Sequence, residues 1–172
     1  LDRLGVRRPT ILHPGAGAAW KRWPVERYAE LAAQLRRRGH DVLLVEGPAD
    51  ENVVAQVQRD MAAPLPTLPR MGARALAAVL TQARLVVGND SGVTHLASAT
   101  GSPTIALFGS TDPASWRPLG RPRILRRCTK TASGDSAVRL CDDPACMAAL
   151  TVEEVLEAAE ELDVQNRVET RR

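Results

Sequence analysis

Aromatic side chains are scarce in this chain of 172 residues: three Trp, one Tyr and one Phe amount to 3% of it. Proteins that hold single-stranded nucleic acid stack its bases on exposed aromatic rings. The net charge is +3, and the terminal Arg171-Arg172 supplies part of that excess. A mild positive charge without stacking aromatics therefore argues against a nucleic-acid partner.

Cysteines and long apolar runs are also few. An odd number of cysteines argues against a disulfide framework and for a reducing compartment, and the three are Cys128, Cys141 and Cys146. Their spacing contains no CxxC pair, so no metal site is expected. No run of about 18 apolar residues and no signal-like start is present, which predicts no membrane span. The first residue is not Met, as expected of a fragment of a longer protein.

Apolar strands alternate with amphipathic helices in the first two thirds of the chain. The strands are continuous rather than alternating apolar runs, which predicts a parallel sheet covered by helices on both faces. The fold class is therefore α/β, a Rossmann-like doubly wound sheet with strand order 3-2-1-4-5. We expect strands at 10–13, 41–46, 65–68, 85–88 and 103–108, and helices at 25–38, 50–61, 73–83 and 91–100.

The pattern loosens after residue 110, where 123–125 is the one candidate strand. An amphipathic helix at 151–162 follows, and Thr151 with Glu154 three residues later forms a capping-box pattern at its start. Its apolar positions, which should pack on the sheet, are Val152, Val155, Leu156 and Ala159. No internal repeat or low-complexity linker divides the chain, so residues 1–172 should form a single domain.

Two unusual loops follow the first and fourth strands, between which the predicted strand order reverses. Ligands of such sheets bind at the carboxyl ends of the strands beside that reversal. The loops are 14–24 and 88–94, so we expect the site to lie between them.

The second loop leads from a buried strand into a helix through Asp90-Ser91-Gly92-Val93-Thr94-His95. The first N–H groups of a helix attract anions, and a glycine there lets a phosphate approach closely. Ser91 and Thr94 add hydroxyl donors, and His95 can stabilise a departing diphosphate. Asp90 can cap the helix, contact the ligand, or do both.

The first loop carries Gly15 and Gly17, which permit a tight path beside a ligand, followed by the cations Lys21 and Arg22. It matches neither GxxxxGK[ST] nor GxGxxG, so neither a nucleoside triphosphatase nor a dehydrogenase is favoured. After the second strand, Asp50 or Glu51 can accept hydrogen bonds from ribose hydroxyls. Alternatively, the negative charge of either residue can simply stabilise the N-terminus of the next helix.

These segments together resemble glycosyltransferase family 9, the ADP-heptose:lipopolysaccharide heptosyltransferases. The resemblance is to the C-terminal half of those enzymes only. The matching pieces are HPGAGAAWKRWP at 13–24, GPADE at 47–51, LVVGNDSGVTHLASATGSPTIALFGSTDP at 85–113 and CMAALTVEEVL at 146–156. The resemblance implies the GT-B architecture, in which two Rossmann-like domains enclose the active site. The C-terminal domain of such enzymes holds the nucleotide-sugar donor, and the N-terminal domain holds the acceptor.

Carried onto this sequence, the resemblance makes Lys21 the donor-phosphate lysine and Glu51 the acidic residue at the ribose. Asp90, Ser91, Gly92 and His95 match the element around the diphosphate and sugar. The implied reaction is an inverting, metal-independent displacement at the anomeric carbon, with Lys21 and His95 as leaving-group stabilisers. The predicted substrate-binding set is Gly15, Gly17, Lys21, Glu51, Asp90, Ser91, Gly92, Val93, Thr94 and His95.

The resemblance also implies what this chain lacks. The family's acceptor-activating aspartate lies in the N-terminal domain and has no counterpart here, so the chain should bind a donor without transferring sugar and holds no catalytic base. No cofactor is implied beyond the donor substrate, ADP-heptose.

The implied partners are that donor, the missing N-terminal acceptor domain and a lipid-linked or lipopolysaccharide acceptor. The implied location is cytoplasmic, at the periphery of the inner membrane. Two alternatives stay open: a stand-alone nucleotide-binding module without catalysis, and a UDP-sugar-using GT-B or epimerase-like domain.

Overall fold

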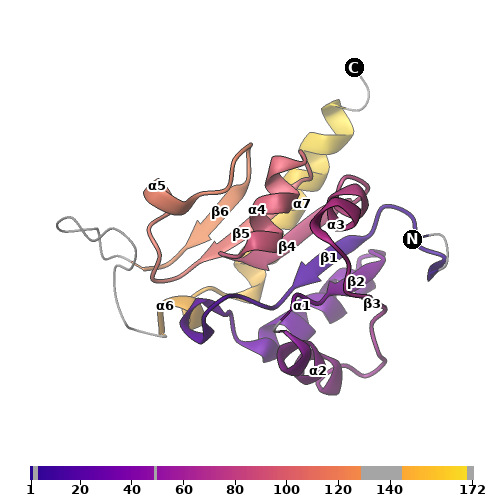
Figure 1. The fold of residues 1–172 in the computed structure, drawn as a ribbon, viewed down its shortest axis with the longest axis horizontal. Coiled ribbons are helices and arrows are strands. Elements are labelled where there is room, and N and C mark those ends of the chain that lie inside the picture. Colours follow the sequence, from indigo (N-terminus) through magenta and orange to yellow (C-terminus); the bar gives the residue numbers. More distant parts are fainter. Residues whose placement is uncertain (2–3, 49, 129–144, 170–172) are drawn as a thin grey trace.

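A six-stranded parallel sheet forms the centre of the molecule (Figure 1). The computed structural model describes residues 1, 4–48, 50–128 and 145–169, with side chains described as far as residue 165. The strand order is β3-β2-β1-β4-β5-β6. The strands are β1 (Thr10–His13), β2 (Val42–Val45), β3 (Thr67–Leu68), β4 (Leu85–Asn89), β5 (Thr104–Phe108) and β6 (Arg123–Arg126).

The predicted order 3-2-1-4-5 is confirmed, and the candidate strand at 123–125 extends it. β6 pairs in parallel with β5, where Ile105 lies opposite Arg123. β3 is shorter than expected because prolines flank it on both sides and proline cannot donate to a strand ladder. The reversal of strand order between β1 and β4 is where we expected it.

Helices cover both faces of the sheet. The helices are α1 (Val25–Arg37), α2 (Glu51–Arg59), α3 (Ala73–Leu80), α4 (Gly92–Ala99), α5 (Pro113–Trp116), α6 (Ala145–Ala148) and α7 (Val152–Glu169), with a 3-10 turn η2 (Ala19–Lys21). One buried cluster joins α1, α2 and α7 to the sheet, and the other joins the opposite face to α3 and α4. The sheet is thus buried on both sides, as its apolar strands predicted.

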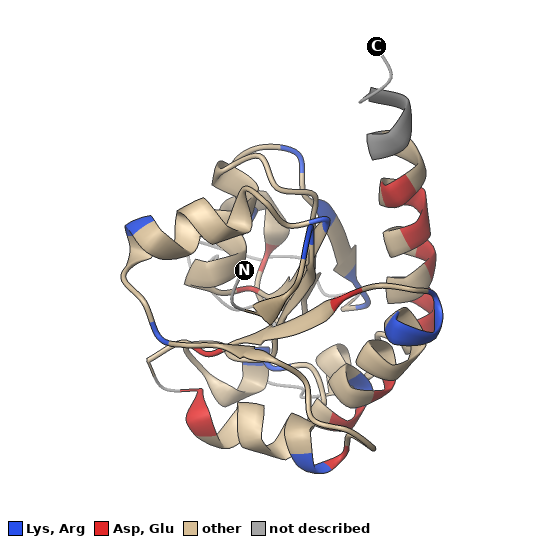
Figure 2. Ribbon diagram, turned by 90° about the vertical axis from the view of Figure 1, so that its right-hand side faces the viewer, with Lys and Arg blue, Asp and Glu red and all other residues tan. Residues whose placement is uncertain are grey.

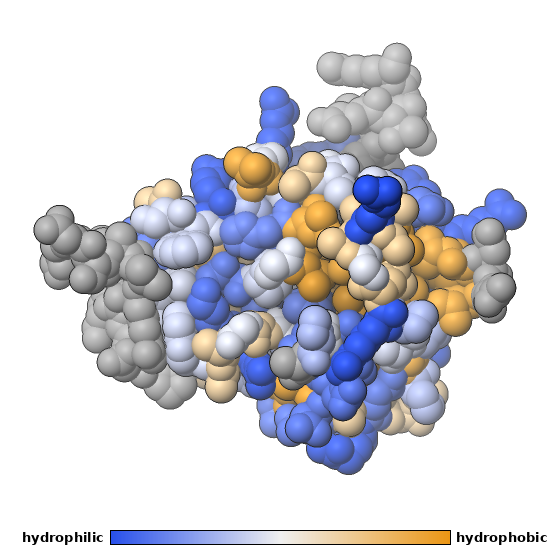
Figure 3. Space-filling model, in the orientation of Figure 1, coloured by the Kyte–Doolittle hydropathy of each residue, from blue (hydrophilic) through white to orange (hydrophobic). Residues whose placement is uncertain are grey.

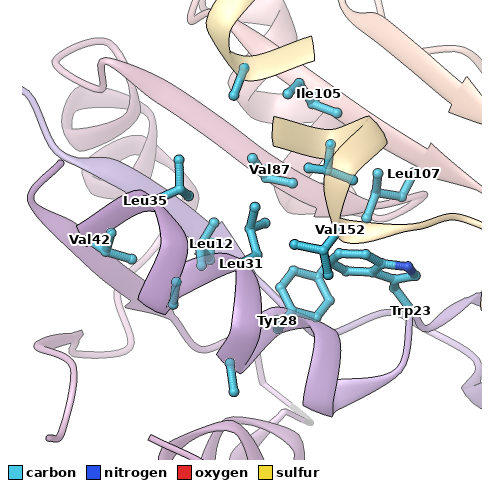
Figure 4. Close-up of a cluster of buried hydrophobic side chains, with 14 of the residues drawn as sticks. Leu12, Trp23, Tyr28, Leu31, Leu35, Val42, Val87, Ile105, Leu107 and Val152 are labelled. Carbon is cyan, nitrogen blue, oxygen red and sulfur yellow. The ribbon is translucent and has the colours of Figure 1, made fainter. Parts of the chain in front are cut away.

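The larger cluster is built around Trp23 and Tyr28, which are fully buried and pack edge to face with ring centroids 5.1 Å apart (Figure 4). The Trp23 indole N–H donates to the carbonyl of Leu150 at 2.9 Å. This bond ties Trp23, two residues before α1, to the residue before the Thr151 cap. The start of α1 and the start of α7 are therefore held to one another beside the sheet.

The capping box at the start of α7 is confirmed. The Thr151 N–H donates to the Glu154 carboxylate at 2.8 Å, and the Glu154 N–H donates to the Thr151 hydroxyl at 3.2 Å. The four apolar positions predicted to pack are buried. The helix is longer than the expected 151–162, because no glycine or proline follows Leu162 to end it. Acidic residues recur along its coloured part (Figure 2).

Among the described residues, no helix has both the length and the apolar character needed to cross a membrane. Of the cysteines, Cys128 is buried and Cys146 is partly buried, while Cys141 lies outside the described residues. The same part of the chain holds no group of three or more His, Cys, Asp or Glu side chains placed for a metal ion.

Candidate functional site

The two predicted loops meet at the carboxyl ends of β1 and β4, which are adjacent strands with His13 opposite Gly88. One contact between them is an ion pair, in which the Lys21 ammonium lies 2.6 Å from the Asp90 carboxylate. The Asp90 side chain is 4% exposed and that of Lys21 22%. The two segments are therefore in direct contact at the carboxyl ends of the strands, and that they form one ligand site stays a prediction.

Asn89, at the end of β4, fixes the path of the first loop. Its side chain is fully buried, and its amide N–H groups donate to the carbonyls of Pro14 at 2.9 Å and Gly15 at 3.1 Å. Its amide oxygen accepts from the Trp23 N–H at 3.0 Å and the Tyr28 hydroxyl at 3.2 Å. Burial raises the pKa of Tyr28, so this hydroxyl keeps its proton and can donate. The sequence analysis missed Asn89, although a polar residue at the end of a buried strand is a usable signal.

The prediction that Asp90 caps α4 is wrong, because Ser91 is the N-cap. Ser91 has the extended backbone of a cap residue, and its hydroxyl accepts from the Thr94 N–H. The Asp90 carboxylate turns instead toward the Lys21 ammonium and toward His95, whose Nε2 lies 3.3 Å away. Asp90 therefore fixes two of the predicted ligand-binding side chains.

His13 links the second strand to the start of α4. Its Nε2 lies 3.0 Å from the Asp50 carboxylate, and its Nδ1 lies 3.1 Å from the Ser91 hydroxyl. A carboxylate can only accept hydrogen bonds, so Nε2 carries a proton. The hydrogen bond from His13 lowers the pKa of Asp50, outweighing burial, and the Gly47 N–H adds a second bond at 3.0 Å. Asp50 is therefore ionised at neutral pH.

Gly15 makes room for this pair. A Cβ atom at Gly15 would lie 2.0 Å from the carboxyl carbon of Asp50, which is a severe overlap. The surrounding bonds hold the Asp50 carboxylate in place, so a side chain at Gly15 would have to displace it. The glycine predicted to run beside a ligand thus also serves the packing of the site's own residues.

Glu51, the residue expected at the ribose, is exposed and pairs with Arg70 at 2.5 Å. Asp50, the other candidate for that role, lies in the pocket wall. It makes no side-chain hydrogen bond that caps α2. The choice between these two carboxylates for a ribose contact stays a prediction.

A pocket of about 550 Å³ opens beside the ion pairs, between the ends of β1 and β2 and the helices α3 and α4. Apolar side chains of the surface gather around α3 (Figure 3), and the apolar part of the pocket is continuous with the core cluster under α3 and α4. The pocket is lined by His13, Ala16, Gly17, Gly47, Pro48, Asp50, Met71, Ala73, Leu76, Ser91, Gly92, Val93 and Leu96.

Apart from Gly15, which packs on Asp50, and Glu51, which is exposed, the predicted site residues fall into three groups. Gly17, Ser91, Gly92 and Val93 line the pocket. Lys21, Asp90 and His95 form the ion-paired cluster. Thr94 is buried below both, where its hydroxyl donates to the Asn89 carbonyl at 2.7 Å.

Sequence reasoning missed the apolar wall formed by Met71, Leu76 and Leu96. The signal that the sequence offered for this wall was the apolar composition of α3, ARALAAVL.

The sequence model of glycosyltransferase family 9 (heptosyltransferase) matches residues 1–139. The chain belongs to glycosyltransferase family 9. Lipopolysaccharide heptosyltransferase 2 of Escherichia coli K12 is 35% identical over 150 residues, a match covering 78% of this chain and 42% of that relative. Lipopolysaccharide heptosyltransferase 3 of the same strain is 32% identical over 125 residues, a match covering 69% of this chain and 36% of that relative.

Solved family 9 structures share the fold. The E. coli ADP-heptose lipopolysaccharide heptosyltransferase II superposes with a TM-score of 0.81 at 26% identity, over 96% of this chain and 50% of that one. The E. coli heptosyltransferase WaaC with ADP superposes with a TM-score of 0.73 at 25% identity, over 91% of this chain and 44% of that one. This family 9 chain thus spans half or less of the length of these relatives. The Rossmann-like α/β fold is confirmed.

Proposed function

We propose that this family 9 chain binds the nucleoside diphosphate of a sugar donor, ADP-heptose, in the pocket beside the Lys21–Asp90 ion pair. The single observation that carries the proposal is the meeting of the two loops. The start of α4, a pocket of nucleotide size and the Lys21–Asp90 ion pair lie together at the reversal of strand order. Ligands of doubly wound sheets bind at this place.

The diphosphate belongs at the start of α4. The first N–H groups of a helix lack partners within it and attract anions. The Ser91 hydroxyl takes the N–H of Thr94, whereas Gly92 and Val93 line the pocket. A Cβ atom at Gly92 would meet nothing within 4 Å, so the space above this backbone is open to a phosphate.

The side chains of Lys21 and His95 belong beside the same phosphates. The Lys21 ammonium has three N–H donors, and Asp90 accepts from one of them, which leaves donors for a phosphate oxygen. His95 is held by the other Asp90 oxygen, and its side chain is 37% exposed. Both groups are therefore placed to offset the charge of a leaving diphosphate.

The nucleoside belongs in the remainder of the pocket. Met71, Leu76 and Leu96 supply an apolar surface for a flat base, while Asp50 in the wall and Glu51 at the start of α2 are candidates for the ribose hydroxyls. Adenine is proposed from the relatives, since one solved family 9 structure holds ADP and another ADP-2-deoxy-2-fluoro heptose.

Sugar transfer requires more than these residues provide. We propose that the acceptor, a lipid-linked or lipopolysaccharide glycan, and the base that activates it belong to a second domain at the inner membrane's cytoplasmic face. This proposal is supported by the length of the relatives, of which the chain covers half or less. The isolated chain should therefore bind donor without turnover.

Calorimetric titration with ADP, UDP and GDP tests the proposal. We expect ADP to bind at least about tenfold more tightly than UDP, a difference of roughly 1.4 kcal/mol. Arg37→Ala, which removes an exposed charge at the far end of α1, should leave the affinity unchanged. A preference for UDP would favour a UDP-sugar enzyme, and no binding of any of the three would refute the proposed function.

A further inference from the structure

Three of the five aromatic side chains are fully buried in the core: Trp23, Tyr28 and Phe108. The other two, Trp20 and Trp116, come from distant parts of the sequence but approach the same cation. The Lys21 ammonium lies 5.3 Å from the centroid of the Trp20 ring and 5.8 Å from that of Trp116. Both distances are within the range of a cation–π contact, about 6 Å.

The lysine between the rings is itself anchored by the Asp90 carboxylate at 2.6 Å. The two tryptophans therefore contact a side chain that is itself held within the site. Trp116 nevertheless keeps 42% of its surface exposed. A large aromatic side chain that is both positioned and exposed beside a binding pocket is typical of a contact surface.

Trp116 and the nucleoside pocket lie on opposite sides of β4, along the carboxyl ends of the strands. The pocket is lined by residues that follow β1 and β2 and by residues of α3 and α4. Trp116 ends α5, which follows β5, and β4 with its Ser91–Gly92 junction lies between β1 and β5. Figure 1 shows α5 on the far side of β4 from β2 and β3.

A nucleotide-sugar has the same linear order: base, ribose, two phosphates, sugar. With its nucleoside in the pocket and its phosphates at Ser91–Gly92, its sugar extends toward Asp90, Lys21 and the two rings. A pyranose carries an apolar face of C–H groups, which packs on an aromatic face, and a rim of hydroxyls, which bond to charged side chains. Trp116 and Trp20 offer the aromatic faces, and Asp90 and Lys21 offer the charged groups.

We infer that Trp116 and Trp20, with Lys21 between them, form an aromatic subsite that packs against the sugar ring of the donor. This inference rests on the proposed function, because it uses the placement of the diphosphate. It assigns Trp116 as a specificity-determining residue that recognises the glycosyl group and not the nucleotide.

Binding of ADP and of ADP-heptose to wild type and to Trp116→Ala tests the inference by calorimetry. The substitution should weaken ADP-heptose on the order of fivefold to tenfold and change ADP affinity by less than about twofold. Trp116→Phe should restore most of the loss, since it keeps an aromatic face. Leu119→Ala removes another exposed apolar side chain (78% exposed) and should change neither affinity.

Acrylamide quenching of tryptophan fluorescence gives a second readout that needs no substitution. ADP-heptose should protect the fluorescence of the wild type more than ADP does, because Trp23 is already buried and only Trp116 and Trp20 can become covered. In the calorimetric titrations, Trp116→Ala could weaken ADP and ADP-heptose binding equally, or weaken neither. Either result would overturn the aromatic subsite and leave the proposed function standing. A wild type that binds neither ligand would instead refute the proposed function.

Discussion

Asn89→Asp is expected to lower the free energy of unfolding by about 3–5 kcal/mol, the range for an uncompensated charge in a protein interior. The new carboxylate would still accept from the Trp23 N–H and the Tyr28 hydroxyl. It has no N–H to offer the carbonyls of Pro14 and Gly15, which the Asn89 amide now satisfies. The substitution thus replaces two buried hydrogen bonds by repulsion at a fully buried position.

Urea unfolding followed by circular dichroism at pH 7 measures this loss. Asn52→Asp is the matched control, because Asn52 is exposed in the first turn of α2 and the same change there should be nearly neutral. The deficit of Asn89→Asp should also shrink in mild acid, where the introduced carboxyl can take up a proton and donate it. Equal midpoints for the two variants would show that the Asn89 bonds do not hold the loop.

Gly92→Val is expected to weaken ADP binding on the order of 100-fold while leaving the protein as stable as the wild type. A Cβ atom at this position would meet no protein atom within 4 Å, and the backbone does not have a positive φ. Valine also has a higher helix propensity than glycine. The added side chain would occupy the space above the start of α4 and keep a phosphate from the backbone N–H groups, whose bonds to a charged ligand are worth about 1.5–3 kcal/mol each.

Calorimetry with ADP and a thermal melt of the same samples measure both halves of this expectation. Ala99→Val is the matched control, since it adds the same side chain at the exposed last residue of α4, at the opposite end from the pocket. A variant at Gly92 that binds ADP as tightly as the wild type would place the diphosphate elsewhere. A variant that unfolds would contradict the open space at Gly92.

Local sequence patterns predicted the fold well because each signal belongs to one element. Continuous apolar strands indicated a parallel sheet, and their alternation with helices gave its order. The Thr151–Glu154 capping box was readable because its two partners lie three residues apart. The same locality explains why the motif between 88 and 95 lies, as predicted, at a strand-to-helix junction, where part of it lines the pocket.

What the sequence analysis missed depends on contacts between distant residues. Asp90 was expected to cap α4, but Ser91 is the N-cap. The Asp90 carboxylate pairs instead with Lys21, which lies on a loop distant in the sequence. The bonds of His13 to Asp50 and Ser91 join three separate loops, and no spacing rule reveals them. The approach of Trp116 to Lys21 likewise follows from the positions of β1 and β5 on either side of β4.

The central claim, that a nucleoside diphosphate occupies the junction of the two loops, is tested most directly by mapping backbone amide shifts of the isotope-labelled chain during titration with ADP. We predict the largest shifts within 15–21 and 91–95, with the N–H groups of Gly92 and Val93 foremost, and no change at Val164 on the exposed part of α7. Saturable binding with its largest shifts away from both loops, or no shift at Gly92, would contradict the account.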